Sequence, residues 1–382
     1  MTTAPTPSTG HAAGIDSAFM PQLDGLRAIA VMAVLVHHYL RLGTAGTVAG
    51  LEPGLLGVRL FFVLSGFLIT GILLRARQTV EQGLASRREV LQQFYIRRAL
   101  RIFPLYYGVL LAAWVFGSAE ARDQLPWLAS YSYNFWIAQL GWYPAHFSHF
   151  WSLAVEEQFY LLWPAAILLV PRRALLPFLL AVIVAAPLYR ALAWNLSLPS
   201  LWFYVATPSA LDALGMGALL AVMAQGQAPA KRLARALLPL GALALLGCVL
   251  LQHQPAAAAV FTETLVSLLF MTLVAAAGAG AHGAGPRGVA GRLLEARPLQ
   301  YLGKISYGVY VYHLFLPDVA RALLAPMGIT PPLQGTAHFL VYTAATIAVA
   351  SLSWHAFERP LNALKSRYAV PSPADAVVVR TP

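Results

Sequence analysis

The sequence predicts an all-α protein, a polytopic membrane bundle of about ten transmembrane helices with both termini in the cytosol. Composition is the first reason, because 59% of the 382 residues are hydrophobic and only 11% are charged, whereas a soluble domain carries about 25% charged residues. Hydropathy is the second, since apolar stretches of roughly 18 to 20 residues, long enough to cross a hydrocarbon core, recur along the chain. The third is that Lys and Arg cluster between these stretches.

The apolar stretches predict ten spans, near 23–42, 54–74, 99–117, 150–170, 174–193, 203–224, 236–252, 258–280, 299–323 and 336–357. The segment 118–149 is rich in aromatic residues, including Trp127, Tyr131, Tyr133, Trp136, Trp142 and Tyr143. Such a composition is typical of a membrane interface. We expect this segment to be an interfacial belt or partly re-entrant, because a further span would reverse the orientation of every later helix.

Charge sets the predicted orientation. The net charge is +11, from 26 Lys and Arg against 15 Asp and Glu. With ten spans and a cytosolic N-terminus, most basic residues lie on the cytosolic side, as the positive-inside rule requires. The outer loops then keep Arg41 and Arg122, with Arg190 and Arg321 as two further candidates. The basic residues do not form the face of a nucleic-acid-binding domain, so we expect no nucleic-acid partner.

The chain is predicted to hold one membrane domain, residues 21–360, between a disordered cytosolic tail at 1–20 and a cytosolic C-terminal tail at 361–382. The single cysteine, Cys248, lies in an apolar run and is predicted to pack there. We expect no metal and no bound cofactor. The Ala- and Leu-rich composition with more Arg than Lys indicates a bacterium with GC-rich coding, so the expected location is the bacterial cytoplasmic (inner) membrane.

Ionisable groups inside spans are costly and therefore indicate function. In LDGLRAIAVMAVLVHHYL, Arg27 opens the helix and His38 follows about three turns later, so an ideal helix places both on one stripe roughly 16 Å apart. His37 is rotated about 100° away. The His38 imidazole can take a proton from an attacking hydroxyl. The alternative is an ordinary core histidine.

In FYIRRALRIFPLYY, basic residues crowd the predicted cytosolic start of a helix. Arg98 and Arg101 share a helix face. Guanidinium groups suit phosphate oxygens, and a helix N-terminus adds partial positive charge. The alternative is a positive-inside flank that contacts lipid headgroups.

In SHFWSLAVEEQFYLLWP, Ser152, Glu156 and Tyr160 repeat every four residues and therefore line one helix face. No Lys or Arg lies nearby in the sequence, so Glu156 needs a partner from another helix. The alternative is a protonated glutamate, or an acid that only marks the helix start.

Two further segments carry polar residues inside spans. In GVRLFFVLSGFLITGILL, Gly66 permits close helix approach and Ser65 can hydrogen-bond across helices, whereas Arg59 lies near the outer end and is expected to snorkel to the interface. In GKISYGVYVYHLFLP, His313 lies among tyrosines and either lines a cavity or makes structural hydrogen bonds.

Together these segments resemble the acyltransferase-3 family of integral membrane O-acyltransferases. The resemblance runs from Leu23 to Pro360 and depends on six motifs in order, LDGLRAIAVMAVLVHH, FFVLSGFLI, FYIRRALRIFPLYY, HFWSLAVEEQFYLLWP, ISYGVYVYH and FERP. It implies a membrane enzyme that acylates hydroxyls of glycans, lipid-linked saccharides, peptidoglycan or macrolide-type small molecules, usually from acetyl-CoA. The family's arginine–histidine pair matches Arg27 and His38. Its R-x-x-R element, which is thought to meet the phosphates of coenzyme A, matches Arg98 and Arg101. The alternative, a positive-inside flank that contacts lipid headgroups, stays open for these two residues.

The resemblance also covers the later motifs. Its WSLxxE element places the acid at Glu156, with Tyr160 one turn further on, and His313 closes the SYxxYxxH-like stretch. Two positions depart from the family pattern. Arg59 stands where members often carry an acid, and Ala210 stands where many carry the arginine of a later RxD-like motif. These departures concern the acceptor side and leave the donor side intact.

The predicted function is transfer of an acyl group, acetyl by expectation, from acyl-CoA to a hydroxyl of a glycan, lipid-linked saccharide or macrolide-type acceptor. His38 is the expected general base, and Glu156 is expected to orient the acceptor. Arg27 is expected to help the R-x-x-R arginines hold the phosphates. The rival hypothesis is a transporter or flippase for an anionic or lipid-linked solute, in which the same charges line a path.

Overall fold

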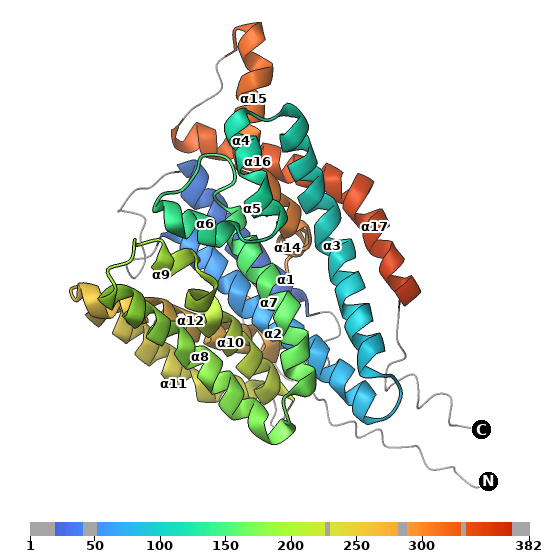
Figure 1. Cartoon of the computed structure of the whole chain (residues 1–382), viewed down its shortest axis with the longest axis vertical. Helices are drawn as coiled ribbons and strands as arrows, with labels where there is room; N and C mark the ends of the chain where they lie inside the picture. Colours follow the sequence, from blue (N-terminus) through green and yellow to red (C-terminus); the bar gives the residue numbers. More distant parts are fainter. Residues whose placement is uncertain (1–19, 41–51, 226–229, 282–288, 330–333, 369–382) are drawn as a thin grey trace.

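Long apolar helices dominate the computed structural model, which describes residues 20–40, 52–225, 230–281, 289–329 and 334–368 (Figure 1). Eight helices in this part of the chain are long and apolar enough to cross a membrane. They are α1 (Pro21–Leu35) with its π-helical extension Val36–Leu40, α2 (Pro53–Glu81), α3 (Arg87–Phe116), α8 (Arg172–Asn195), α9 (Trp202–Val205) with α10 (Thr207–Ala224), α11 (Ala230–Leu251), α12 (Pro255–Ala281), and α16 (Gly335–Ser353) with η4 (Trp354–Glu358) and α17 (Arg359–Ala363). The prediction of an all-α polytopic membrane bundle is confirmed.

Two further helices occupy the remaining predicted spans. α7 (Phe150–Leu169) matches the predicted span 150–170 closely. α14 (Arg297–Tyr312) covers only the first part of the predicted span 299–323. The chain turns after α14 and begins α15 (Leu316–Leu324), which projects from the bundle in Figure 1. The single long span was therefore wrong, and Pro317 is the physical reason, because a proline is tolerated in the first turn of a helix but not in its interior.

α3 begins well before its predicted start. Ser86 caps the N-terminus of this helix. Its hydroxyl accepts a hydrogen bond from the backbone amide of Glu89, and the Glu89 carboxylate accepts one from the backbone amide of Ser86. This capping box starts the helix at Arg87, so Arg98 and Arg101 lie three to four turns inside α3. The expectation that these arginines sit at a helix N-terminus was wrong, and the helix dipole contributes nothing to their charge because it acts only near the first turn.

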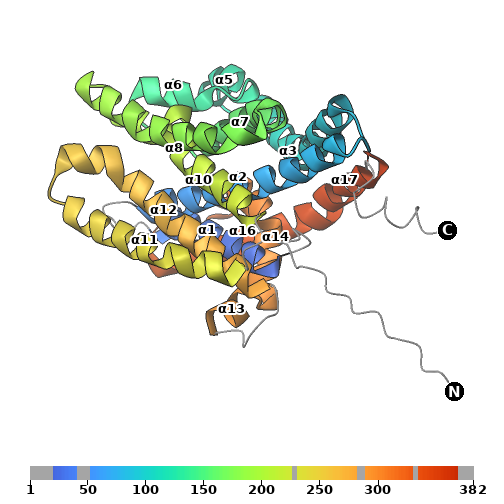
Figure 2. The ribbon, with the colours of Figure 1, turned by 90° about the horizontal axis from the view of Figure 1, so that it is seen from below.

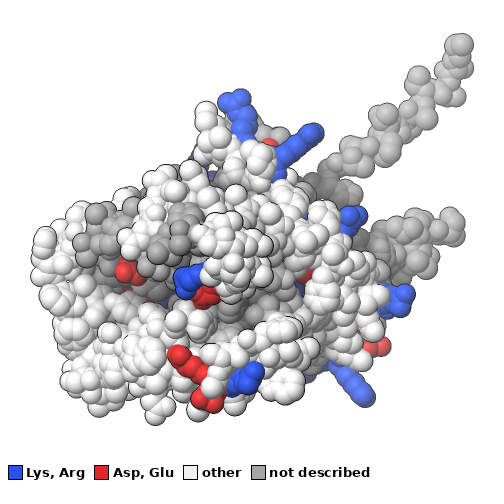
Figure 3. Space-filling view, turned by 90° about the horizontal axis from the view of Figure 1, so that it is seen from above, with Lys and Arg blue, Asp and Glu red and all other residues white. Residues whose placement is uncertain are grey.

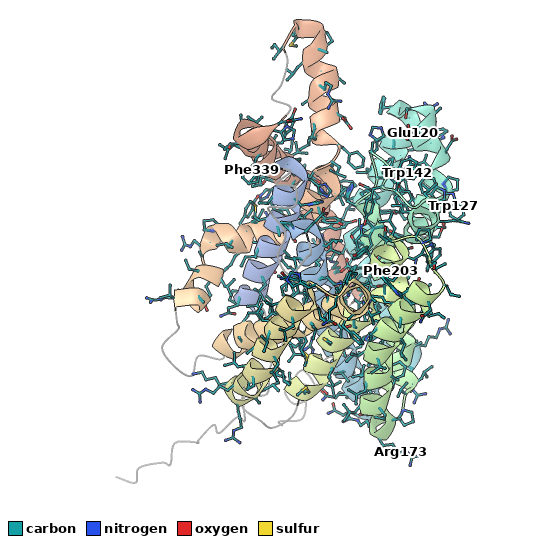
Figure 4. All side chains as sticks on the ribbon, turned by 90° about the vertical axis from the view of Figure 1, so that its left-hand side faces the viewer. Glu120, Trp127, Trp142, Arg173, Phe203 and Phe339 are labelled. Carbon is teal, nitrogen blue, oxygen red and sulfur yellow. The ribbon has the colours of Figure 1, made fainter. Side chains whose placement is uncertain are left out.

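The aromatic segment 118–149 forms short helices, α4 (Ala119–Asp123), α5 (Leu125–Ala129) and α6 (Tyr133–Leu140). None of these three is long enough to cross a membrane. Trp127 and Trp142 are exposed there, and Figure 4 shows them near one end of the molecule while Arg173 lies at the other. The lack of a long helix in this segment agrees with the prediction that it does not form a further span, and an interfacial belt or a partly re-entrant segment stays the prediction.

Basic loops gather at the end that carries Arg173. Arg172 donates two hydrogen bonds to Glu81 at the end of α2, with nitrogen–oxygen distances of 3.1 and 2.5 Å, and Arg77 donates a third at 2.9 Å. The α2–α3 and α7–α8 connections therefore lie on one side, as the charge pattern predicts. The opposite end, seen in Figure 3, carries few Lys, Arg, Asp and Glu side chains on an otherwise uncharged surface.

α2 and α10 cross in direct contact at the centre of the bundle, between α7 and α8 on one side and α12 on the other (Figure 2). A Cβ on Gly66 would overlap the carbonyl oxygen of Leu214, and a Cβ on Gly217 would overlap that of Val63. Close approach of this kind requires glycine. The predicted packing role of Gly66 is confirmed.

A buried ion-pair network joins four helices beside this crossing. Arg59 of α2 and Arg190 of α8 each lie 2.7 Å from an oxygen of Asp212 on α10. Glu263 of α12 pairs with both arginines, at 3.1 Å from Arg190. Arg59 was expected to snorkel and Arg190 was a candidate for an outer loop, and both expectations were wrong. Two buried acids lie within reach of the guanidinium groups, and pairing there avoids an isolated charge in an apolar interior.

The remaining described elements are α13 (Val289–Leu294), η3 (Ala325–Met327) and η5 (Leu364–Tyr368). Most of the predicted N-terminal tail and the last residues of the predicted C-terminal tail lie outside the described residues. Residues 361–368 are helical, and α17 and η5 pack against α3. Cys248 is buried, as its apolar surroundings predict.

Candidate functional site: a polar cavity inside the bundle

A cavity of about 100 Å³ lies among α1, α2, α3, α7 and α14, which adjoin one another in the middle of Figure 1. Its lining is unusually polar for the interior of a membrane bundle. The polar lining residues are Arg27, Ser65, Arg98, Arg101, Ser152, Glu156, Glu157, Tyr160, Ser306, Tyr307 and Tyr310. Charged groups inside a membrane bundle are energetically costly, so a cavity lined by five Arg and Glu residues is the natural candidate for a binding site.

One wall of the cavity is basic. Arg27 comes from α1, and Arg98 and Arg101 come from α3. Arg27 donates a hydrogen bond of 2.7 Å to Asp24, so part of its charge is already compensated. Arg98 stacks over the ring of Tyr160, with 5.4 Å from the guanidinium carbon to the ring centroid. Within the described ranges, neither Arg98 nor Arg101 has a carboxylate within 4 Å, so both remain available to an anionic ligand.

A further cation approaches this wall from the C-terminal segment. Lys365 lies in η5, which packs against α3. Partial burial and the neighbouring charges of Arg101, Arg98 and Arg97 lower the pKa of Lys365 to about 7. Nothing in the sequence connects Lys365 with the cavity, because more than 260 positions separate it from Arg101.

Another part of the lining, next to the arginines, carries carboxyl and hydroxyl groups. The Ser65 hydroxyl on α2 donates a hydrogen bond to Glu156 on α7. The Tyr160 hydroxyl donates to Ser65 across 3.1 Å. Glu156 therefore has a partner from another helix, and Ser152, Glu156 and Tyr160 all face the cavity. Glu157 also lines the cavity, although the sequence analysis had named only Glu156 as a site residue.

Ser152 and Tyr310 form another part of the lining. Their hydroxyl oxygens lie 2.5 Å apart, and the Tyr310 hydroxyl also lies 2.8 Å from the carbonyl oxygen of His149. The sequence pointed to the tyrosines of α14 only as neighbours of His313. The structure places two of them, Tyr307 and Tyr310, in the cavity lining itself.

The histidines lie next to the cavity rather than in its lining. The His38 ring centroid is 5.0 Å from that of His313, which in turn is 5.5 Å from the ring of Tyr310. His313 was expected either to line a cavity or to make structural hydrogen bonds. It is fully buried and is not among the lining residues, and its Nδ1 lies 2.6 Å from the carbonyl oxygen of Tyr310. His38 packs against this buried ring and so faces the interior of the bundle.

Arg27 and His38 were expected to lie on the same face of one regular α-helix, but the α-helical geometry does not continue as far as His38. α1 is α-helical only to Leu35, and residues Val36–Leu40 form a π-helix. A π turn contains more residues than an α turn, so it rotates His38 away from the position that ideal α-helical spacing predicts. Arg27 therefore lines the cavity, whereas His38 lies outside the lining and contacts the ring of His313.

His149 was missed by the sequence analysis. Its ring centroid is 4.7 Å from that of His313 and 5.6 Å from that of Tyr310. The available signal was its position one turn before Ser152 in the motif HFWS. In the part of the chain that the structure describes, no group of three or more His, Cys, Asp or Glu residues is arranged to hold a metal ion.

The fold and the cavity define a polytopic membrane protein with an internal polar site, part of which is lined by arginines. The chain belongs to the acyltransferase-3 family, whose acyltransferase domain matches residues 20–355. The predicted family is confirmed. No solved structure matches the chain.

Three relatives are similar to the chain. The peptidoglycan O-acetyltransferase OatA of Listeria monocytogenes is 28% identical over 90% of this chain and 56% of its own length. YrhL of Bacillus subtilis, provisionally named for the same activity, is 30% identical over 90% of this chain and 55% of its own length. A Staphylococcus aureus protein, SAS0844, provisionally named an O-acetyltransferase, is 36% identical over 38% of this chain and 24% of its own length. The chain thus spans about half the length of the first two relatives.

Proposed function

We propose that this protein is a membrane-embedded O-acyltransferase of the bacterial cytoplasmic membrane, with both termini in the cytosol. It moves an acyl group, most simply acetyl, from acyl-CoA to a hydroxyl of a glycan, lipid-linked saccharide or macrolide-type acceptor. The family supports acyl transfer. The names of two relatives favour a glycan acceptor related to peptidoglycan.

The observation that carries the proposal is the basic wall of the cavity. Coenzyme A carries a diphosphate and a separate phosphate, and guanidinium groups bind phosphate oxygens through paired charge-assisted hydrogen bonds. Arg98 and Arg101 face the cavity without a carboxylate within 4 Å among the described residues. Arg27 adds a third guanidinium group. In this proposal the three arginines hold the phosphates and the thioester arm extends along the cavity.

The proposed chemistry uses one base and one orienting group. His38 removes the proton of the acceptor hydroxyl, whose oxygen attacks the thioester carbonyl. The new oxygen–carbon bond forms, the carbon–sulfur bond breaks, and the proton ends on the sulfur of coenzyme A. Glu156, which is held by Ser65, orients the acceptor hydroxyl. A positioned base of this kind contributes about 10²- to 10⁴-fold to the rate.

The test uses the full chain in lipid nanodiscs with acetyl-CoA and a panel of acceptors that includes N-acetylglucosamine–N-acetylmuramic acid oligosaccharides. Thiol release measures donor consumption, and mass spectrometry of the acceptor measures acetylation. We expect His38→Ala to lose about 10²-fold or more of the rate, with the exposed His253→Ala as the matched control. Full acyl transfer by a folded His38→Ala protein would contradict the mechanism. Solute accumulation in sealed vesicles without thiol release would contradict the function itself.

A further inference from the structure

Four histidine rings form a continuous row beside the cavity. Ring centroids are 4.7 Å apart for His149 and His313, 5.0 Å for His313 and His38, and 4.7 Å for His38 and His37. At the far end, His37 lies 3.5 Å from a carboxylate oxygen of the exposed Glu52. The row begins at Tyr310 in the cavity lining, which is within 5.6 Å of both His149 and His313.

The hydrogen bonds of the two deepest histidines define their tautomers. His149 Nε2 lies 3.2 Å from the carbonyl oxygen of Val311, and His313 Nδ1 lies 2.6 Å from the carbonyl oxygen of Tyr310. A carbonyl can only accept, so each of these nitrogens carries the proton. The other nitrogen of each ring, Nδ1 of His149 and Nε2 of His313, therefore holds a free lone pair.

Both lone pairs are buried. His149 is 3% exposed and His313 is fully buried, and neither free nitrogen has a hydrogen-bond partner among the described residues. An unsatisfied buried acceptor costs about 1–3 kcal/mol. A histidine that served packing alone would be expected to satisfy both nitrogens, and here two neighbouring rings each keep one basic nitrogen unpaired. Unpaired buried polar atoms of this kind point to a functional role.

We propose that His313 and His149 form a proton-holding pair that serves His38. This inference rests on the proposed function. The acceptor hydroxyl gives its proton to His38, and His38 passes it to Nε2 of His313, beside the second unpaired nitrogen on the neighbouring ring of His149. The proton then returns to the thiolate of coenzyme A as that group leaves. No proton is gained or lost overall, and the two histidines are positioning residues that act through His38.

The pair would hold the proton in the interval between deprotonation of the acceptor and protonation of the leaving thiolate. The base must release its proton before the next hydroxyl can react, and the thiolate that finally receives it forms in the cavity, whose lining includes neither His38 nor His313. The free nitrogens have no hydrogen-bond partner among the described residues, so transfer from His38 to His313 requires a ring rotation or an entering water molecule that bridges the two rings. A buried pair of neutral imidazoles can hold that proton without exposing it to solvent.

The experiment uses the full chain in nanodiscs with His313→Gln, His149→Gln and the double variant, because glutamine keeps a polar side chain but does not accept a proton. His253→Gln is the matched control, since His253 is exposed and lies far from the row in the sequence. Turnover is measured with acetyl-CoA and the acceptor oligosaccharide. Binding of unacylated coenzyme A is measured separately by calorimetry. A His313→Ala protein is also assayed with and without added imidazole.

We expect kcat to fall about 10²-fold in both single variants, with KM and coenzyme A affinity within about twofold of wild type. The double variant should fall no further than the single ones, because residues that act as a unit are not additive. Imidazole should restore turnover of His313→Ala. Wild-type turnover in the glutamine variants, a parallel loss of coenzyme A affinity, or failure of imidazole rescue would each overturn the proton-holding role while leaving the acyltransferase proposal intact. Absence of acetyl transfer by the wild-type protein would instead overturn the proposed function.

Discussion

Replacement of the cavity arginines provides a direct test of donor binding. Arg98→Gln and Arg101→Gln remove guanidinium groups that have no carboxylate within 4 Å in the described chain. A hydrogen bond to a charged group contributes about 1.5–3 kcal/mol, and each 1.4 kcal/mol is tenfold in affinity. Each variant should therefore bind coenzyme A about 10- to 100-fold more weakly than wild type.

Arg27→Gln should have a smaller effect. Its guanidinium group already donates to Asp24 at 2.7 Å, so a phosphate must compete with that carboxylate. Less interaction energy is lost when Arg27 is removed, and we expect about a 3- to 10-fold loss of affinity. The predicted order is therefore a larger loss for Arg98 and Arg101 than for Arg27.

Calorimetry of the protein in nanodiscs measures these affinities, with coenzyme A and 3′-dephospho-coenzyme A as ligands. A variant that has lost its contact to the 3′-phosphate should bind both ligands equally. Arg173→Gln is the control, because Arg173 is exposed and lies at one end of the molecule (Figure 4). Affinities within twofold of wild type for both Arg98→Gln and Arg101→Gln, or a larger loss for Arg27→Gln, would refute the reasoning.

Two further predictions concern other parts of the bundle. Asp212→Ala removes the carboxylate that faces Arg59 and Arg190, and breaking a buried ion pair costs about 3–5 kcal/mol. The midpoint of thermal unfolding in detergent should therefore shift to lower temperature. An unchanged midpoint would count against a stabilising role of the ion-pair network. Coenzyme A affinity should fall between pH 6 and pH 8, because Lys365, with its pKa lowered to about 7, loses its positive charge over that interval. Lys365→Arg stays charged and should reduce this dependence, so an identical pH profile for Lys365→Arg would exclude Lys365 from the site.

Much of the fold could be predicted from the sequence, because an apolar stretch of sufficient length must become a helix when its backbone cannot hydrogen-bond to lipid. The same local rule placed Ser152, Glu156 and Tyr160 on one face, since a helix repeats every 3.6 residues. The break before α15 could have been predicted from Pro317 alone. The early start of α3 at the Ser86 capping box was likewise visible in the sequence.

Contacts between helices could not be predicted in this way. Helical periodicity determines which residues share a face, but it leaves open how each helix is rotated and which distant helix it meets. Arg59 therefore looked like a residue at the membrane interface until its pairing with Asp212 was seen. Lys365 approaches Arg101 only because η5 packs against α3.

The sequence by itself determined the helices, the family and the residue types of the cavity, because these depend on local hydropathy and on motifs within single helices. Only the tertiary structure decided which polar groups meet. Burial in a low-dielectric interior strengthens every charge and hydrogen bond, so packing across several helices selects the partners. The neighbouring unpaired nitrogens of His149 and His313 are visible only once α7 and α14 have been brought together.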